Sequence, residues 1–447
     1  MRILICTKLF YPSEAIGSVR PTNFAIYLKK LGHDVTVITA NTQVEYDVLD
    51  NGINIIRVSN SSIITQIKNK NERRVNGSNK LRKENTNNSL HTNNLSVGFF
   101  SILKTFLSSV FEFTVDFDWY LSAVKTSISK FNHNSFDIVL SSFGPLSSFL
   151  LGRKIKKLRI ARFWISDFRD NMKNEANLTW LNLIYEYFEK KSVAQADLLT
   201  FVSFGQKEIF ELNNKVDFLQ REKSIVIYNG FERLFERVIS QISSNKKMTF
   251  LYAGQLYSGK RDFSMFFEAL SQLVFEDKVD IHKIKVCYAG NNSSIFQNQS
   301  KKFLNLHGVF EDYGLISKKD SVLLQNNADI LIALTWNTVH EKGILTGKFF
   351  EYLQAQKPII SICCGTVPEA ELTLLVRKLN LGIACETACF NQDIKVLKNY
   401  LLARYTEFLN SEKIYFEPDF EKVKEFHFSF SVKQLNNYMN ILLNKSN

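Results

Sequence analysis

Two separate series of strand and helix signals constrain the fold of this 447-residue chain more than any other feature. The first series opens with the apolar run RILIC at 2–6, a helix expected over Pro21–Leu31 and VTVIT at 35–39. The second begins with MTFLYAG at 248–254 and continues through three further apolar segments to residue 364. Strands that are apolar on both faces and joined by helices form parallel sheets. The sequence therefore predicts an α/β protein with two Rossmann-like domains, each built on a parallel sheet.

The predicted domains divide the chain near residue 235. Residues 1–235 form the first domain, residues 236–418 form the second, and residues 419–447 are expected to be a helix that crosses back to the first. Inside the first domain, residues 62–96 are rich in Asn, Lys and Arg and poor in apolar residues, which predicts a mobile basic insertion. Seven basic residues and one acidic residue lie between Lys68 and Lys83.

An amphipathic helix is predicted directly after this insertion, over residues 97–113. At 100° per residue, its apolar face carries Phe99, Ile102, Leu103, Phe106, Val110 and Phe113. Two interpretations remain open. The helix either packs on its own sheet, or it docks on anionic lipid beside the basic insertion. A second basic run, Arg153 to Arg162, lies in the same predicted domain.

Composition narrows the class of protein. The formal net charge of +12 favours anionic partners, but no recognised nucleic-acid module is present, so nucleic acid is not expected as a partner. No stretch of eighteen apolar residues occurs, so we do not expect a membrane-spanning helix. The six cysteines include no CxxC, and Cys385 and Cys389 have no His or Cys cluster around them, so no metal site is predicted. A reduced, cytoplasmic protein fits this pattern best.

Candidate ligand-binding residues in the first domain follow two predicted strands. Gly17 lies in the loop after the first strand, just before a helix whose N-terminal amides can hold an anion. Asp167, Arg169 and Asp170 end the strand at 162–166, where side chains of a parallel sheet meet a bound ligand. Carboxylates and a guanidinium at this edge suit hydrogen bonds to sugar hydroxyls, although a surface salt-bridge set is the alternative. The pattern Asp116-Phe117-Asp118 resembles a metal-binding D-x-D, but it follows a helix and is set aside as a chance match.

The first loop of the second domain carries three further candidates. Gly254 ends the strand at 248–254 and lets the backbone approach a ligand closely. Lys260 and Arg261 stand just before the next helix, where the helix dipole also favours an anion. A diphosphate would meet two cations and free amides here, whereas a basic surface without a ligand is the alternative.

The segment from 340 to 360 is the most informative. Thr346 and Gly347 lie at a predicted helix start, Lys348 lies in the first turn, and Glu351 lies one turn on. Thr346 can cap the helix, the neighbouring amides can hold a phosphate, and Glu351 can accept hydrogen bonds from ribose hydroxyls. An ordinary amphipathic helix is the alternative.

Taken together, the motifs resemble glycosyltransferase family 4, which has the GT-B fold of two Rossmann-like domains facing across a cleft. The resemblance rests on MRILICTKLFYPSEAIGSVRPTNFAIYLKKLGHDVTVIT at the N-terminus and on WISDFRD, IVIYNGF, AGQLYSGKRDF and TGKFFEYLQAQKPII. Glu351 matches the second of the family's paired glutamates. The position of the first is Gly343, so that contact is missing or is supplied by Glu341. Gln255 stands where the family often has Arg, which leaves Lys260.

This resemblance implies a retaining glycosyltransferase of surface polysaccharide synthesis at the inner face of the cell membrane. The donor would be a nucleotide-diphosphate sugar, UDP-sugar by family frequency, and the acceptor a carbohydrate, often lipid-linked. Neither a cofactor nor a metal is implied, because Lys260 and helix amides would stabilise the leaving diphosphate, and Asp170 would orient the donor sugar or the acceptor. Two alternatives remain: a GT-B-fold sugar-nucleotide epimerase, and a non-catalytic subunit that supports a partner transferase.

Overall fold

The structure is a computed structural model of the chain. It describes residues 1–13, 15–41, 52–61, 64, 94–173, 177–232, 247–411 and 414–444, and for residues 94–104 only the backbone. The basic run 68–83 and the predicted domain boundary at residue 235 lie outside the described residues.

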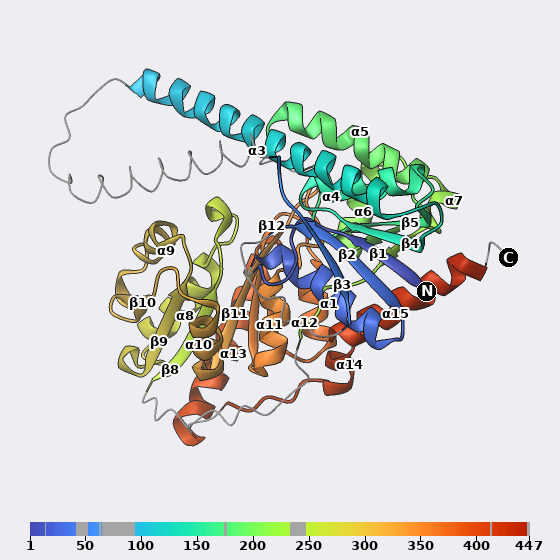
Figure 1. Ribbon diagram of the computed structural model, residues 1–447. Coiled ribbons are helices and arrows are strands. Elements are labelled where there is room, and N and C mark those ends of the chain that lie inside the picture. Colours follow the sequence, from blue (N-terminus) through green and yellow to red (C-terminus); the bar gives the residue numbers. More distant parts are fainter. Residues whose placement is uncertain are drawn as a thin grey trace. The chain divides into compact units, whose positions relative to one another are not determined.

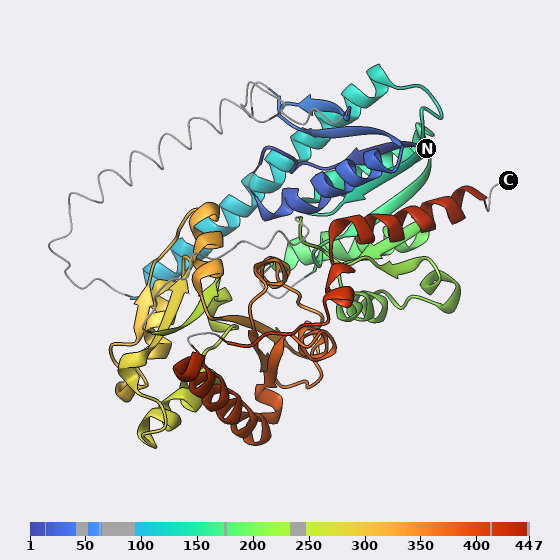
Figure 2. The same ribbon diagram turned by 90° about the horizontal axis from the view of Figure 1, so that it is seen from below.

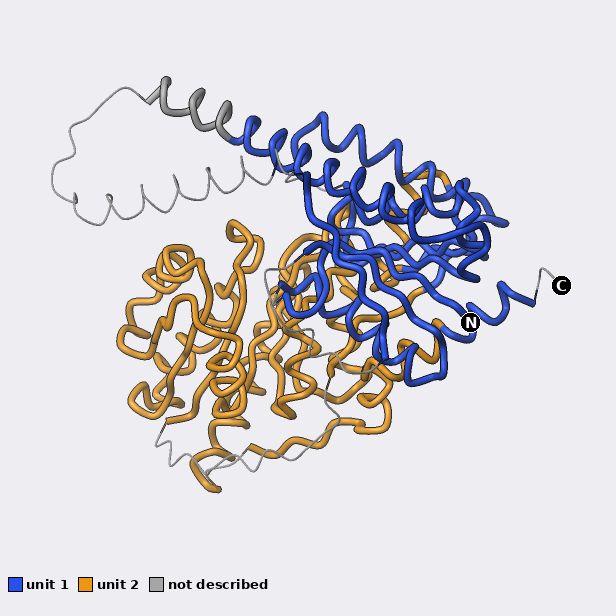
Figure 3. Tube along the Cα trace, viewed as in Figure 1, with its two compact units in different colours: residues 1–200, 216–225, 436–447 blue, residues 201–215, 226–435 orange. Residues whose placement is uncertain are grey.

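The chain forms two compact units, coloured separately in Figure 3. Unit 1 comprises Met1–Thr200, Val216–Ile225 and Asn436–Asn447, and unit 2 comprises Phe201–Lys215 and Val226–Leu435. The last helix, α15 (Phe428–Asn444), is therefore divided between the two units.

A seven-stranded sheet in the order β3-β2-β1-β4-β5-β6-β7 forms the centre of unit 1. Its strands are β1 (Arg2–Cys6), β2 (Asp34–Ala40), β3 (Asn54–Val58), β4 (Phe136–Ser142), β5 (Ala161–Phe168), β6 (Leu198–Phe201) and β7 (Ser224–Val226). Its helices are α1 (Ile16–Lys30), α3 (Asn94–Lys130), α4 (Leu146–Lys157), α5 (Thr179–Gln195) and α7 (Phe218–Arg221). In Figures 1 and 2, α3, α4 and α5 lie together on one face of this sheet, and α1 lies on the other.

Unit 2 contains a six-stranded sheet in the order β10-β9-β8-β11-β12-β13. Its strands are β8 (Met248–Ala253), β9 (Ile284–Ala289), β10 (Phe310–Asp312), β11 (Ile330–Asn337), β12 (Ile359–Gly365) and β13 (Gly382–Glu386). Its helices are α6 (Phe204–Asn214), α8 (Ser264–Phe275), α9 (Ser293–Ser300), α10 (Lys318–Asn327), α11 (Gly347–Ala355), α12 (Glu371–Lys378), α13 (Phe390–Ser411) and α14 (Phe420–Lys424). Short 3₁₀ turns lie at Tyr257–Gly259 (η1), Ile281–Lys283 (η2), Leu304–Leu306 (η3) and Thr387–Cys389 (η4).

The burial of the strands explains why they could be predicted from the sequence. All eight residues of β11 are buried, and two separate apolar clusters enclose the sheet of unit 2. A parallel sheet covered on both faces requires this continuous apolar pattern. The prediction of an α/β fold with two parallel, Rossmann-like sheets is confirmed.

The start of α1 corrects the sequence prediction. A helix over Pro21–Leu31 was expected, but the helix begins at Ile16 and contains Pro21. Proline has no N–H, so it cannot donate to the carbonyl four residues earlier, which belongs to Gly17. Nη1 of Arg169 donates to the Gly17 carbonyl instead. A side chain from β5's carboxyl end thus supplies the hydrogen bond that the helix lacks.

The helix predicted over residues 97–113 is present and is longer, because α3 runs from Asn94 to Lys130. Its inner face is anchored by Trp119, which is fully buried and donates from Nε1 to the carbonyl of Val58 at 3.1 Å. Ala123 and Ser127, further along the same face, are also fully buried. Part of α3 therefore packs on its own unit.

Candidate functional site

In unit 2 the strand order reverses between β8 and β11. Ligands of open α/β sheets bind beyond the carboxyl ends of the strands at such a reversal, because the loops there diverge to opposite faces. The loop after β8 carries Gly254, Lys260 and Arg261, and the loop after β11 carries residues 338–346. Two of the predicted donor-binding segments therefore lie at this switch point.

A Lys–Glu–Trp cluster joins the two switch-point loops. Nζ of Lys260 lies 2.6 Å from Oε2 of Glu341, and Nε1 of Trp336 donates to the same oxygen at 2.6 Å. Lys260 also lies 5.4 Å above the Trp336 ring. The Lys260 side chain is 40% exposed, whereas that of Glu341 is 11% exposed. The carboxylate thus holds Lys260 in place and leaves part of its side chain open to solvent.

Arg261 is more constrained than the sequence suggested. It is only 6% exposed, and its guanidinium lies 4.3 Å from the Tyr257 ring centre. Its Nη1 donates to the carbonyl of Gln255 at 2.9 Å and lies 3.3 Å from Oη of Tyr252. Within the described part of the chain, its Nε is buried without an acceptor. Arg261 therefore braces the loop after β8, and its predicted contact with the donor stays a prediction.

Helix α11 is tied to the same edge of the sheet. The backbone N–H of Ala253, the last residue of β8, donates to Oη of the buried Tyr352 at 3.0 Å. Thr346 is the N-cap, and its Oγ1 accepts from the N–H of Phe349 at 3.2 Å. This confirms the predicted capping role of Thr346. The first amides of any helix have no acceptor within the helix, so the N-terminus at Gly347 is suited to an anion.

Glu351 belongs to a polar network between α11 and α10. Its Oε2 accepts from Nζ of Lys348 at 2.6 Å and from Nε2 of Gln325 at 3.1 Å. Ser321 joins the network through Lys348 at 3.3 Å. The Glu351 side chain is 24% exposed and that of Lys348 is 29% exposed. Both predicted site residues are therefore paired with each other, and their contact with ribose or phosphate stays a prediction.

Gly343 stands where the resemblance to family 4 would put the first glutamate, and its backbone conformation disfavours a side chain. Its φ is +67°, a conformation that side chains rarely adopt. A Cβ there would lie 2.7 Å from the backbone nitrogen of Gln206 and 2.8 Å from Cα of Gly205, at the start of α6. Glu341, two residues earlier, carries the carboxylate of this loop, at the Lys260 side chain.

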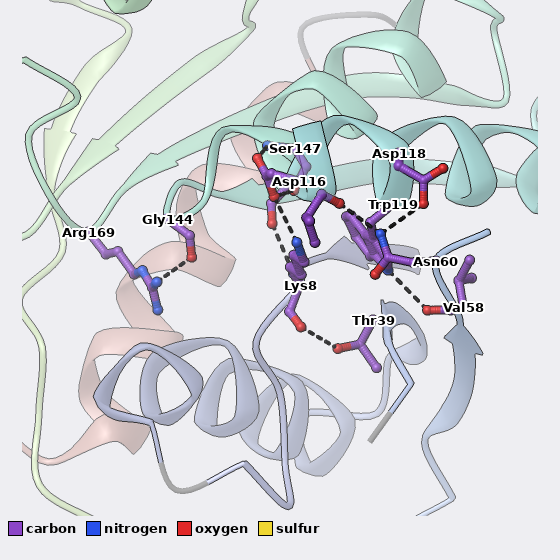
Figure 4. A network of polar contacts seen from close by, with 12 residues as sticks. Lys8, Thr39, Val58, Asn60, Asp116, Asp118, Trp119, Gly144, Ser147 and Arg169 are labelled. Carbon is purple, nitrogen blue, oxygen red and sulfur yellow. Dashed lines mark hydrogen bonds and ion pairs between the residues drawn. The ribbon is translucent and has the colours of Figure 1, made fainter. Parts of the chain in front are cut away.

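In unit 1, Arg169 clamps two loops together. Its Nε donates to the carbonyl of Phe143 at 2.7 Å, its Nη2 donates to the carbonyl of Gly144, and its Nη1 donates to that of Gly17. Figure 4 shows the bond to Gly144. The loops after β1 and β4 flank the point where the sheet of unit 1 reverses its order. Gly17 therefore lies at a switch point too, with a guanidinium bound to its carbonyl.

Asp167 is a buried structural carboxylate and not the ligand-facing group that the sequence pattern predicted. It is 0% exposed and lies 2.7 Å from Nη2 of Arg20. Ser142 and Thr200 also donate to it, at 2.8 and 2.7 Å. Burial alone would raise the pKa of Asp167, but the charge of Arg20 and the hydrogen bonds outweigh it, so the pKa lies below its ordinary value.

Asp170 differs from its neighbour. Its side chain is 71% exposed, and it lies 3.6 Å from Nε of Arg169. Among the three polar residues that end β5, it is the one with most of its side chain open to solvent. Its predicted part in orienting a sugar stays a prediction.

The D-x-D carboxylates have structural partners on different elements, as Figure 4 shows. Asp116 accepts from the backbone N–H of Ser147 at 2.9 Å, which caps the N-terminus of α4, and from Nζ of Lys8 at 3.1 Å. Asp118 accepts from Nδ2 of Asn60 at 2.9 Å and from the N–H of Ser61 at 2.8 Å. These carboxylates attach α3 to the rest of unit 1.

Within the described ranges, no three His, Cys, Asp or Glu side chains form a group that could hold a metal ion. All six cysteines are free thiols. A search of the same residues found no helix with both the length and the apolar character needed to cross a membrane.

Comparison with known proteins defines the fold class. No protein-family profile matches the sequence, and no curated protein matches it by sequence. Sucrose-phosphate synthase from Thermosynechococcus elongatus matches in structure with a TM-score of 0.61 and 11% identity, over 100% of both chains. The HepE protein of Anabaena, solved in complex with UDP-glucose, matches with a TM-score of 0.54 and 12% identity, over 98% of this chain and 99% of that one.

A third solved structure, the lipopolysaccharide outer core galactosyltransferase WaaB, has a TM-score of 0.54 and 14% identity, over 98% of both chains. At these identities the likeness concerns the fold. It confirms the GT-B class of two Rossmann-like domains, whereas membership of family 4 stays a prediction.

Proposed function

We propose that this chain is a retaining glycosyltransferase that moves a sugar from a nucleotide-diphosphate donor to a carbohydrate acceptor. The observation that carries the proposal is the cluster of Lys260, Glu341 and Trp336 at the switch point of unit 2, on the same edge as the capped N-terminus of α11. A cation held by a partly buried carboxylate, together with helix amides, is an arrangement that suits a diphosphate. The structural likeness to HepE, solved with UDP-glucose, supports UDP-sugar as the donor.

The chemistry follows from where charge develops. The bond between the anomeric carbon and the diphosphate oxygen breaks, and the acceptor oxygen bonds to the same face of that carbon. The departing phosphate oxygen takes the acceptor's proton, so atoms and charge balance without a protein nucleophile. Lys260, Lys348 and the amides at Gly347 would stabilise the diphosphate, because fixed donors aimed at developing charge lower the barrier. Such a reaction needs no metal.

Asp170, in unit 1, is the group we assign to the sugar or the acceptor. Its side chain is exposed at the carboxyl end of β5. The preceding residue, Arg169, is fixed by its hydrogen bond to the carbonyl of Phe143. Gly17 lies in the first turn of α1, where a Cβ would collide with Nη1 of Arg169. The lack of a side chain there lets the guanidinium reach the Gly17 carbonyl. In this assignment Arg169 is a positioning residue that fixes the geometry of both loops.

We further propose that the acceptor is lipid-linked and that the enzyme works at the cytoplasmic face of the cell membrane in surface polysaccharide synthesis. The support is the resemblance to family 4 and the structural likeness to WaaB, which is named as a lipopolysaccharide outer core galactosyltransferase. A lipid carrier stays in the bilayer, so the enzyme must reach the membrane surface.

A sugar-nucleotide screen tests the proposal. Thermal-shift measurements with UDP-, GDP- and ADP-sugars should give the largest rise in melting temperature for one UDP-sugar. That donor should then be consumed with a lipid-linked acceptor, with retained anomeric configuration and with activity in the presence of a chelator. Epimerised donor formed without acceptor would identify the epimerase alternative. Absence of both a shift and nucleotide release across the panel would overturn the proposal in favour of a non-catalytic subunit.

A further inference from the structure

Helix α3 exposes a stripe of large apolar side chains. Phe106, Val110, Phe117, Leu121 and Ile128 are 43%, 38%, 42%, 53% and 56% exposed. They recur at intervals of four and seven residues, which places them along one side of the helix. The buried residues Trp119, Ala123 and Ser127 lie on a different side. The helix therefore has an inner face that packs on its own unit and an apolar face open to solvent.

Helix α5 widens this stripe into a surface. The ring of Trp180 lies 6.2 Å from that of Phe106 and 5.8 Å from that of Phe113, so the start of α5 is in contact with α3. One and two turns further along α5, Leu183 is 66% exposed and Tyr187 is 53% exposed. Figure 1 shows the two helices side by side on the outer face of their layer. We call this region the α3–α5 surface.

Lysines lie beside Tyr187 and Leu121 on the α3–α5 surface. Nζ of Lys191 lies 5.1 Å above the Tyr187 ring. The Lys190 side chain is 58% exposed, but its Nζ is paired with Glu186 at 2.7 Å. Lys125 is exposed on α3, close in the helical spiral to Leu121. Aromatic rings and lysines whose stems lie along apolar surface are the side chains that settle at the boundary between headgroups and acyl chains. Their charge is complementary to anionic headgroups.

We propose that the α3–α5 surface docks unit 1 on an anionic lipid bilayer. Phe106, Phe117, Leu183 and Tyr187 would enter the headgroup boundary, and Lys125 and Lys191 would contact the anionic headgroups. If the acceptor is lipid-linked, as in the proposed function, this docking brings the enzyme to its acceptor. The binding itself rests on the surface alone, so it can be tested apart from catalysis.

Co-sedimentation with vesicles tests the docking. The full chain should sediment with phosphatidylcholine vesicles that contain about one-third phosphatidylglycerol, and less as salt rises from about 0.05 to about 0.5 M, because the charge attraction is screened. The double variant Leu121→Glu/Leu183→Glu should bind at least about 100-fold more weakly, since two exposed leucines of the surface (53% and 66%) become charged. Equal binding to vesicles of phosphatidylcholine alone would overturn the anionic assignment.

Matched controls keep the result interpretable. Phe275→Glu/Leu304→Glu changes two apolar residues of unit 2 that are 84% and 79% exposed, and it should bind vesicles like the wild type. Both double variants should keep the wild-type melting temperature and the shift with UDP. Wild-type vesicle binding by the α3–α5 variant would refute the proposal. A change from dimer to monomer, with no vesicle binding by the wild type, would instead assign the surface to a second copy of the chain.

The proposed glycosyltransferase activity and the proposed membrane docking can be disproved independently of each other. Nucleotide release with a soluble acceptor does not involve vesicles, so its absence would count against the glycosyltransferase alone. Loss of vesicle binding in the wild type, with turnover intact, would count against the docking surface alone.

Discussion

Lys260 is held at 2.6 Å by Glu341 while 40% of its side chain stays exposed, so it can meet a ligand without a large movement. Lys260→Ala should lower kcat by about 10²-fold, as removal of one preorganised donor to developing charge does elsewhere. Steady-state release of UDP measures the effect. Lys398→Ala removes a comparable lysine, paired at 2.6 Å with Glu276, and should behave like the wild type. An unchanged kcat in a folded Lys260→Ala protein would remove Lys260 from the leaving-group site.

Glu351 is the second residue whose role is open to direct measurement. Glu351→Ala should raise the Kd for UDP at least about 10-fold, equivalent to about 1.4 kcal/mol, because the ribose would lose its proposed acceptor and Lys348 loses its carboxylate. Calorimetric titration with UDP gives the value. Gln325→Ala removes only the neighbouring hydrogen bond to Glu351 and should change the Kd much less. Equal effects of the two substitutions would indicate a structural network without a ribose contact.

The lowered pKa of Asp167 predicts that the free energy of unfolding depends on pH. Its folded pKa lies below the unfolded value of about 3.9, so its stabilisation is present above about pH 4 and is lost as pH falls through the folded pKa. Asp167→Asn leaves Arg20 buried without its carboxylate and should cost about 3–5 kcal/mol at pH 7. Urea denaturation between neutral and acidic pH should show a shallower acid limb in the variant. Asp137→Asn, which breaks the exposed pair with Arg2, should cost below about 1 kcal/mol.

At the scale of elements, the loop between β11 and α11 depends on the close approach of Gly343 to the start of α6. Gly343→Ala should destabilise the protein by more than the cost of about 1–2 kcal/mol for a left-handed non-glycine residue, because the new Cβ also meets Gly205 and Gln206. Gly308→Ala is the matched control, since its φ is +97° but nothing lies within 4 Å of the added atom. Equal losses of stability in chemical denaturation would show that backbone strain alone decides the position.

The elements that could be predicted from sequence are those whose burial leaves a local pattern. Strands β1, β8 and β11 are covered on both faces and therefore form near-continuous apolar runs in the sequence. The edge strand β10 has only three residues, two of them acidic, and gives no such signal. Likewise, the first turn of α1 was missed, because the donor that replaces the N–H of Pro21 comes from a residue 152 positions away.

The residues of the candidate site also differ in whether a local sequence pattern could predict them. The N-cap at Thr346 and the loop residues Gly254 and Lys260 follow local rules for helix starts and strand ends, so the sequence predicts them. Their place at the switch point follows from the strand order of the structure. The sequence does not predict the pairing of Lys260 with Glu341, because this pairing depends on how the loop after β11 folds back at Gly343. The sequence indicates Glu341 only as a substitute for the glutamate missing at Gly343. The burial of Asp167 with Arg20 joins residues 147 positions apart and has no local signature.

For the whole molecule, the division into two units predicts which unit a bound nucleotide protects from hydrogen exchange. The residues assigned to the diphosphate and the ribose lie in unit 2, so UDP without sugar or acceptor should slow hydrogen exchange in the loop after β8, in residues 338–346 and in α11. At about 100 times its Kd, UDP should add about 2.7 kcal/mol to the stability of the state that binds it. Lys260→Ala should reduce both effects, whereas Lys398→Ala should leave them intact. Protection centred on the clamped loops at Gly17 and Gly144 instead would place the nucleotide in unit 1 and reverse the donor and acceptor assignments of the two units.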